Sequence, residues 1–424
     1  MKSFTLFTLA SVASTVLAST TPTERISMAP KGFNSDSTVG AAYFMTNEAS
    51  GNYLVSSSIG SDGKLSTPAG NGTRALTPFD TDPLFSQGSV GVSQAGRFVT
   101  NVNAGSNTVS VHAIDIFNPA QLWPIGKPVS SGGDFPNSLV INKAGNRVCV
   151  VNAGAVNGVR GVACLMRGHH SFNYYFHSCY KFNWSHGLTP IPNSIRSLQL
   201  NQTTPVNGSA STPSQIIFSA DEKQLIVSVK TGYLAIWDIN ADGSLSSTFN
   251  TVSGGAIPFS ITPIPGQNAL LVSDPGVGYD IFNLNGTKAK AATISVPVAG
   301  QVAICWSTYR PESGNFYLID VETSIISEVD IAKSLNSTIQ YPLGTDGPLD
   351  TVVATVGKND FMYTLAAKAT GLTVLSVGGP GKLTVLQRID PRRTSKGGQA
   401  CDKRHKCAGN DDLHRLVIMS GLEN

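Results

Sequence analysis

Charged side chains are scarce in this chain of 424 residues. Lys and Arg together number 30 and Asp and Glu 27, so charged residues make up 13% of the sequence and the formal net charge is +3. Soluble domains usually carry about 25% charged residues. This scarcity excludes a coiled coil, a charge-rich disordered chain and a protein that binds nucleic acid mainly through phosphate contacts. We therefore expect no nucleic-acid partner.

The chain also lacks an apolar run of the roughly 20 residues that a membrane-spanning helix needs. Its apolar stretch Phe4–Leu17 is shorter, follows a basic start and ends near the small-residue site Val16-Leu17-Ala18. This pattern predicts a secretory signal peptide over residues 1–18, with an interfacial or membrane-anchoring helix as the alternative. We expect a secreted, extracellular or wall-associated protein with no membrane span.

Asn-x-Ser/Thr sequons fit an exported glycoprotein, although they also arise by chance in chains rich in Asn and Ser. Six are present, at Asn71, Asn183, Asn201, Asn207, Asn285 and Asn336. The five outside the unusual segment 160–186, described below, are the expected glycosylation sites.

Helical periodicity is also missing, because apolar residues never recur at 3.6-residue spacing for long enough to form a helix. After a polar lead over residues 19–40, residues 41–390 consist of short β-branched and aromatic runs between turn residues. The residue that ends the first run marks the same position in each repeat and serves as its anchor. These anchors are Asn47, Asn103, Asn152, Lys230, Asp274, Asp320 and Ala367. Seven such anchors, with three turns per repeat, predict an all-β, seven-bladed β-propeller. A long β-sandwich is the alternative.

Two features interrupt this pattern. The first repeat has no innermost strand before Ala41, so we expect the C-terminal end to supply it. Residues 160–186 and the basic tail 391–424 differ in composition from the rest. They contain six of the seven histidines and four of the six cysteines, namely His169, His170, His177, His186, His405, His414, Cys164, Cys179, Cys401 and Cys407.

Several interpretations of these two segments stay open. A Cys/His zinc cluster and a Cys164–Cys179 disulfide are alternatives for residues 160–186, and a Cys401–Cys407 bridge would close a small loop in the tail. We favour a third interpretation, in which a retained intron and a mis-spliced end produced both segments. Outside them, we expect Cys149 and Cys305 to be buried thiols.

Catalytic motifs are absent from the regular part of the chain. There is no Gly-x-Ser-x-Gly elbow, no His-Glu-x-x-His helix and no phosphate-binding loop, and the one remaining histidine is His112. A single histidine in a strand is more often structural than catalytic. Turn residues Lys230, Asp274, Asp320 and Glu322 face the expected channel mouth, where the carboxylates could hold a cation or simply be solvated. We expect no cofactor and no metal.

The repeat resembles the seven-bladed lactonase family. The resemblance rests on Val90-Gly91-Val92-Ser93, on Asn-Ala-Gly-Ser-Asn at 103–107, and on segments such as Pro83–Ser89, Gly126–Gly133 and Leu234–Asp238. These segments are most similar to the secreted fungal branch named for 3-carboxy-cis,cis-muconate cyclases, which includes wall antigens and adhesins. The resemblance covers residues 41–159 and 187–390.

The enzymes of that family are understood to place His, Arg and Glu around the channel mouth. This chain instead has the amides Gln87, Asn137 and Gln215 in the corresponding loops. An amide cannot transfer protons near neutral pH, but it can bind the hydroxyls of a neutral glycan. Alternatively, these amides only satisfy backbone groups.

Two functions remain. The first is a monomeric binding or wall protein with a degenerate active site, whose partner is a small lactone or a glycan. The second is an active carboxymuconate cyclase, an isomerase, or a lactonase similar to 6-phosphogluconolactonase. Its weak catalytic candidates are His112, Arg97 and Arg147.

Overall fold

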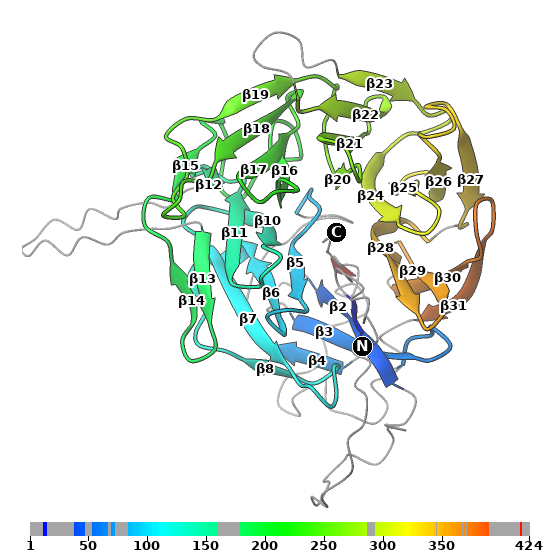
Figure 1. Ribbon diagram of the computed structural model, residues 1–424, viewed down its shortest axis with the longest axis horizontal. Coiled ribbons are helices and arrows are strands. Elements are labelled where there is room, and N and C mark those ends of the chain that lie inside the picture. Colours follow the sequence, from blue (N-terminus) through cyan, green and yellow to red (C-terminus); the bar gives the residue numbers. More distant parts are fainter. Residues whose placement is uncertain are drawn as a thin grey trace, which may run out of the picture.

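The structure is an all-β propeller, as the sequence predicts, and its sheets surround a central axis (Figure 1). It is a computed structural model that describes residues 12–14, 38–46, 53–66, 69–72, 84–159, 179–285, 293–344, 346–366, 368–369, 371–389 and 416–417. Within these residues a single 3-10 turn, η2 (Ala104–Ser106), is helical. None of the described helices is long and apolar enough to cross a membrane.

Six sheets follow one another around the ring, each running from an inner strand to an outer strand. Four of them have four antiparallel strands: β16 (Pro213–Phe218), β17 (Gln224–Val229), β18 (Tyr233–Asp238), β19 (Asn250–Ser253); β20 (Ile261–Pro263), β21 (Ala269–Asp274), β22 (Gly278–Asn283), β23 (Ile294–Pro297); β24 (Ile304–Arg310), β25 (Asn315–Asp320), β26 (Ile325–Val329), β27 (Thr338–Pro342); β28 (Pro348–Val356), β29 (Asn359–Ala366), β30 (Gly371–Val377), β31 (Leu383–Ile389).

The other two sheets of this series carry extra short strands. One contains β5 (Val90–Ser93), β6 (Phe98–Asn103), β7 (Thr108–Ile114), β8 (Leu122–Pro124) and β9 (Val129–Ser130). The next contains β10 (Pro136–Ile141), β11 (Arg147–Asn152), β12 (Gly158–Val159), β13 (Cys179–Asn183), β14 (Gly187–Pro190) and β15 (Arg196–Ser197).

A further sheet lies between β28–β31 and β5–β8 (Figure 1). It contains β1 (Val12–Ser14), β2 (Thr38–Thr46), β3 (Tyr53–Gly60), β4 (Ala69–Gly72) and β32 (Leu416–Val417). Strands β1 and β32 both pair with β2, β1 along Gly40–Ala42 and β32 along Met45–Thr46. The edge expected to receive a C-terminal strand is therefore shared by segments from the two ends of the chain.

The inner strands begin in a similar way. A proline opens β10, β16 and β28, and a register shift follows within the next three residues in these strands and in β24. Proline is tolerated at a strand start because no ladder hydrogen bond is lost there. A bulge redirects the side chains that follow it, so the polar residues at these positions are directed at neighbouring blades.

One disulfide joins Cys149 of β11 to Cys179 of β13, with the two Cα atoms 4.1 Å apart. The prediction that Cys149 is a buried thiol is therefore wrong, and the bridge from Cys179 to Cys164, one of the alternatives, does not form. Sequence reasoning missed this bridge because it placed Cys149 in the regular repeat and Cys179 in the unusual segment 160–186. In the structure Cys149 lies directly opposite Cys179 in the β11–β13 ladder. Cys305 is half-buried and is not part of this bridge.

The end of segment 160–186 is built into its blade. Strand β13 pairs with β11 through Arg147–Cys149 and with β14 beyond it. The boundary of the unusual segment therefore does not coincide with the boundary of the sheet. Residues 160–178 and most of the tail 391–424, including Cys164, Cys401 and Cys407, lie outside the described residues.

Candidate channel mouth

The candidate site is the end of the ring at which the inner strands begin, and residues Leu84–Gly88 cross it. This segment precedes β5 and extends toward the middle of the ring (Figure 1). Its backbone bonds to three other sheets: Gln87 N–H donates to Ser214 O (3.0 Å), Trp306 Nε1–H donates to Ser86 O (3.2 Å), and Leu139 N–H donates to Gly88 O (2.7 Å). We call Leu84–Gly88 the plug.

The side chain of Gln87 fastens the plug to the opposite side of the ring. Its Nε2 donates to Ser307 O (3.1 Å), and its Oε1 accepts from Ser307 N–H (3.2 Å). Ser307 belongs to β24, and Gln87 is buried. This amide therefore uses both of its polar atoms on the backbone of a strand 220 positions away in the sequence.

The other two predicted amides join neighbouring inner strands. Asn137 of β10 donates through Nδ2 to Pro213 O of β16 (2.8 Å), and Gln215 of β16 accepts through Oε1 from Ile261 N–H of β20 (2.5 Å). Both are buried. These contacts match the alternative in which the amides satisfy backbone groups, because none of the three amides is exposed to solvent.

A buried lysine holds the plug from the side. Lys230 donates through Nζ to Phe85 O and to Thr212 Oγ1, and Nζ lies 4.7 Å from the centroid of the Phe259 ring. Phe85 has a φ of 49°, a backbone conformation that is uncommon for a bulky residue. Such strained residues persist only where surrounding contacts hold them, and here Lys230 provides one of those contacts.

The anchor carboxylates cap backbone amides. Asp274 accepts from the amides of Ala256 (2.6 Å), Ile257 (2.9 Å) and Gly276 (2.7 Å). Asp320 repeats the arrangement one sheet further on, with Val302 (2.8 Å), Glu322 (3.0 Å) and Thr323 (3.1 Å) as donors.

Neither of the two interpretations given for the turn acids describes Asp274 and Asp320 well, whereas Glu322 is solvated as one of them expects. Asp274 and Asp320 are buried rather than solvated. Among the described residues, no group of three or more His, Cys, Asp or Glu side chains could hold a metal. Glu322 is exposed and pairs with Lys368 (3.0 Å).

A second buried acid, which sequence reasoning missed, lies beside Asp274. Asp280 of β22 accepts from Ser295 Oγ (2.5 Å), and burial, with a hydrogen bond and repulsion from Asp274, raises its pKa to about 7. Gly255 fits closely over both acids, because a Cβ there would lie 2.4 Å from Asp280 Oδ2 and 2.8 Å from Asp274 Oδ2. The two carboxyl groups therefore share a closed site rather than an open one.

The three weak catalytic candidates do not form a cluster. His112 is buried in β7, where desolvation lowers its pKa to about 4, so its ring is neutral at pH 7. Arg97 is exposed in the β5–β6 turn, and Arg147 begins β11. Each arginine lies at the start of the second strand of its blade, β6 or β11, at the end of the ring opposite the plug.

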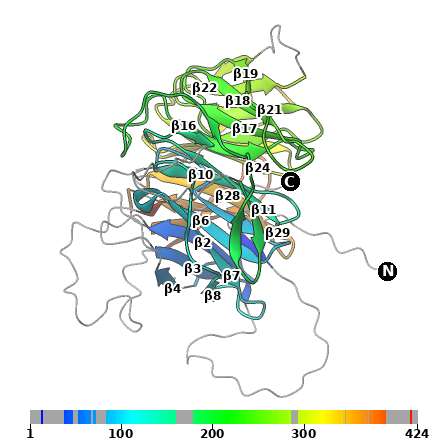
Figure 2. The same cartoon turned by 90° about the vertical axis from the view of Figure 1, so that its left-hand side faces the viewer.

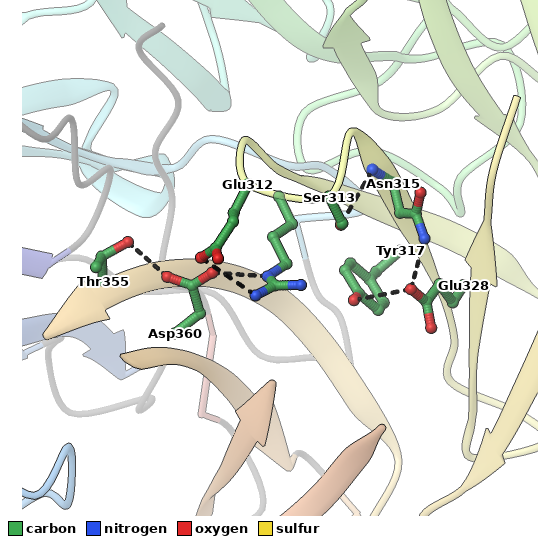
Figure 3. A network of polar contacts seen from close by, with 8 residues as sticks. Glu312, Ser313, Asn315, Tyr317, Glu328, Thr355 and Asp360 are labelled. Carbon is green, nitrogen blue, oxygen red and sulfur yellow. Dashed lines mark hydrogen bonds and ion pairs between the residues drawn. The ribbon is translucent and has the colours of Figure 1, made fainter. Parts of the chain in front are cut away.

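That opposite end carries a polar network of its own (Figure 3). Arg310 Nε lies 2.6 Å from Asp360 Oδ2, which joins the β24–β27 sheet to the β28–β31 sheet. Glu328 accepts from Asn315 Nδ2 (2.7 Å), Tyr317 OH (3.2 Å) and the amide of Gly381 (3.0 Å). All of these groups are occupied by protein partners, which is the arrangement expected of a structural clasp.

Comparison with solved structures identifies the type of propeller. A 6-phosphogluconolactonase candidate from Bacteroides fragilis is 13% identical, with a TM-score of 0.58 over 85% of this chain and 97% of that chain. The periplasmic gluconolactonase PpgL of Pseudomonas aeruginosa is 14% identical, with a TM-score of 0.59 over 82% of this chain and 96% of that chain. This is a lactonase-like propeller fold.

At this level of identity the likeness concerns the fold alone. No protein-family model matches the sequence, and no curated protein is a significant match. Within the lactonase-like propeller, the sequence located the loops of the mouth but missed the plug and the Asp274–Asp280 pair. Two features of the sequence could have pointed to them. Gly88 directly follows the amide Gln87 of the plug, and the acids Asp274 and Asp280 lie six positions apart.

Proposed function

We propose that this chain is a secreted, glycosylated propeller of the carboxymuconate cyclase-like type that binds a partner and does not catalyse a reaction in its channel. The observation that carries the proposal is the plug. Its backbone and the Gln87 side chain are bonded to β10, β16 and β24. A substrate entering from this end would have to break those bonds.

The chemistry of the mouth supports the same conclusion. Amides do not transfer protons near neutral pH. Asp274 and Asp320 already accept three backbone hydrogen bonds each. The lone pairs of these two carboxylates are therefore directed at the protein rather than at a ligand.

We further propose that the sheet of β2 and β3 completes a ring of seven blades.

Export over the secretory route is supported by the Cys149–Cys179 disulfide, because such bridges persist in oxidising compartments. Four proposed glycosylation sites, Asn201, Asn207, Asn285 and Asn336, are exposed. Asn71 lies in β4.

The alternative is an active carboxymuconate cyclase or lactonase. The names of the two similar structures favour it, since both refer to gluconolactonases. Its acid/base chemistry would fall to His112, Arg97 or Arg147. His112 is buried and its ring is neutral at pH 7, which makes this assignment the weaker of the two.

Turnover decides between the two functions. Purified protein is incubated with 3-carboxymuconate, its lactone, δ-gluconolactone and 6-phosphogluconolactone, and the products are followed by NMR. We expect the rate to equal the rate without protein. Turnover that is lost in the His112→Ala variant would establish the enzymatic alternative, while turnover that is retained in that variant would reject the binding proposal and the role of His112 together.

A further inference from the structure

Two of the four tryptophans are exposed, and they lie on neighbouring blades. Trp123 of β8 is 56% exposed and Trp184, in the β13–β14 turn, is 53% exposed, whereas Trp237 and Trp306 are fully buried. Exposed tryptophans are unusual enough in a soluble protein to indicate a contact surface when they occur together.

The strand register fixes the side of the blade on which Trp123 lies. Phe98 of β6 pairs with Ala113 of β7, and Ala113 pairs with Trp123 of β8. Directly opposite residues in an antiparallel sheet share a face. Gly91 is on this same face, and a Cβ there would lie 2.7 Å from Leu139 of β10. The face that carries Trp123 therefore looks toward the next blade.

Trp184 approaches the same space from that next blade. The ring centroid of Phe182 lies 4.0 Å from that of Phe98, and the Trp184 centroid lies 5.5 Å from that of Phe182. Ile125, two residues after Trp123, touches the turn that holds Trp184, because a Cβ on Gly187 would lie 2.9 Å from Ile125 O. Strands β7 and β8 run beside β13 and β14 in Figure 1, and Figure 2 shows this side of the molecule.

We call the surface made of Phe98, Ala113, Trp123, Phe182 and Trp184 the tryptophan crevice. The tilted ring pair of Phe98 and Phe182 lies on its inner side, and the small Ala113 lies between Phe98 and Trp123. Trp123 is two strands away from Phe98, or about 10 Å at the usual strand spacing.

The crevice contains no charged side chain from the strands that form it. Side chains alternate along a strand, so Lys181, adjacent to Phe182, is directed to the opposite face of β13. A phosphate or carboxylate ligand would therefore find no charged partner on these strands. Indole rings that are apolar on their faces and polar at their N–H edge suit a ligand with C–H faces and hydroxyl edges.

We propose that the tryptophan crevice binds one neutral hexopyranose ring of a polysaccharide between Trp123 and Trp184. This inference rests on the proposed binding function and names its ligand class and its location. It moves recognition away from the channel mouth, where the amides are occupied, to the outer rim between two blades.

The test measures binding of laminarihexaose, cellohexaose and mannohexaose by calorimetry. It uses protein that has been enzymatically deglycosylated, so that no sugar linked to Asn183, beside Trp184, can fill the crevice. We expect at least one hexaose to bind, and we expect Trp123→Ala and Trp184→Ala each to raise its Kd about tenfold or more. Trp123→Phe and Trp184→Phe retain an aromatic face and should restore most of the affinity.

The matched control is Phe117→Ala, because Phe117 is 87% exposed but lies in the turn beyond the ends of β7 and β8. It should leave Kd unchanged. Binding that survives in both alanine variants, or that is lost equally in Phe117→Ala, would overturn the crevice while leaving the binding function intact. Absence of binding to all three hexaoses would also overturn it, and neither result depends on lactone turnover.

Discussion

Asp280 is an acid whose protonation departs strongly from that of an ordinary Asp. It lies beside Asp274 under Gly255, in a site too close for any side chain at position 255. Burial and the neighbouring acid favour its protonated form. At the residue scale the mouth therefore consists of buried polar groups that are hydrogen-bonded within the protein. Among them, Asp280 has a pKa near neutral pH.

This predicts that stability falls as the pH rises. The folded-state pKa of about 7 is higher than the value near 4 of an unfolded Asp, so between these values the folded state binds the additional proton. We expect the free energy of unfolding to decrease from pH 4 toward pH 7 and to be flatter in Asp280→Asn, whose amide can donate to Asp274 as the protonated acid does. Urea unfolding at pH 5 and pH 8 measures this.

The exposed acid Asp238 provides the control for that experiment. Asp238→Asn changes the same charge at the end of a comparable strand, β18, and should keep the pH dependence of the natural protein. If Asp280→Asn shows the same slope as Asp238→Asn, the acid pair does not share a proton.

At the scale of strands and blades, the molecule is held by contacts that cross from one sheet to the next. Inner strands are joined by Asn137, Gln215 and Gln87 at the mouth. At the other end the clasp of Arg310 and Asp360 joins β24 to β29, with Thr355 Oγ1 donating to Asp360 Oδ1 (2.6 Å) (Figure 3).

Breaking this clasp should be costly because Arg310 and Asp360 are almost completely buried. We expect Arg310→Met to lower the free energy of unfolding by about 3–5 kcal/mol, since it leaves a buried carboxylate without its cation. The double variant Arg310→Met/Asp360→Asn should lose less. Denaturant unfolding of the two variants and the natural protein measures the difference.

Lys368→Met is the control at an exposed pair, Lys368–Glu322, and should cost less than about 1 kcal/mol. A loss in Arg310→Met no larger than in Lys368→Met would show that the buried pair contributes little to blade packing.

At the scale of the whole molecule, the propeller could be predicted because its repeat is local. Turn residues and β-branched runs recur along the chain, and each blade forms mainly from neighbouring strands. The plug could not be predicted, because Gln87 contacts Ser307 across the ring, and nothing local indicates such a partner. The disulfide was missed for a related reason, since Cys149 and Cys179 become neighbours only when β13 pairs with β11.

The same limit explains the fate of the predicted ligand residues. Sequence reasoning placed Gln87, Asn137 and Gln215 at the mouth from their position before inner strands. It could not decide whether their amides face solvent or backbone, because that depends on bulges and on neighbouring blades. The structure buries all three.

The most direct test of the account is the accessibility of the plug. Ser86 is buried, with Oγ donating to Asn137 O (2.7 Å), whereas Ser209 is exposed. In Ser86→Cys and Ser209→Cys variants, thiol labelling followed by peptide-resolved mass spectrometry reports each new cysteine separately from the natural ones. We predict labelling at position 86 about a hundredfold slower or more, because it requires local opening. Similar rates at both positions would mean that the mouth is open and would contradict the account.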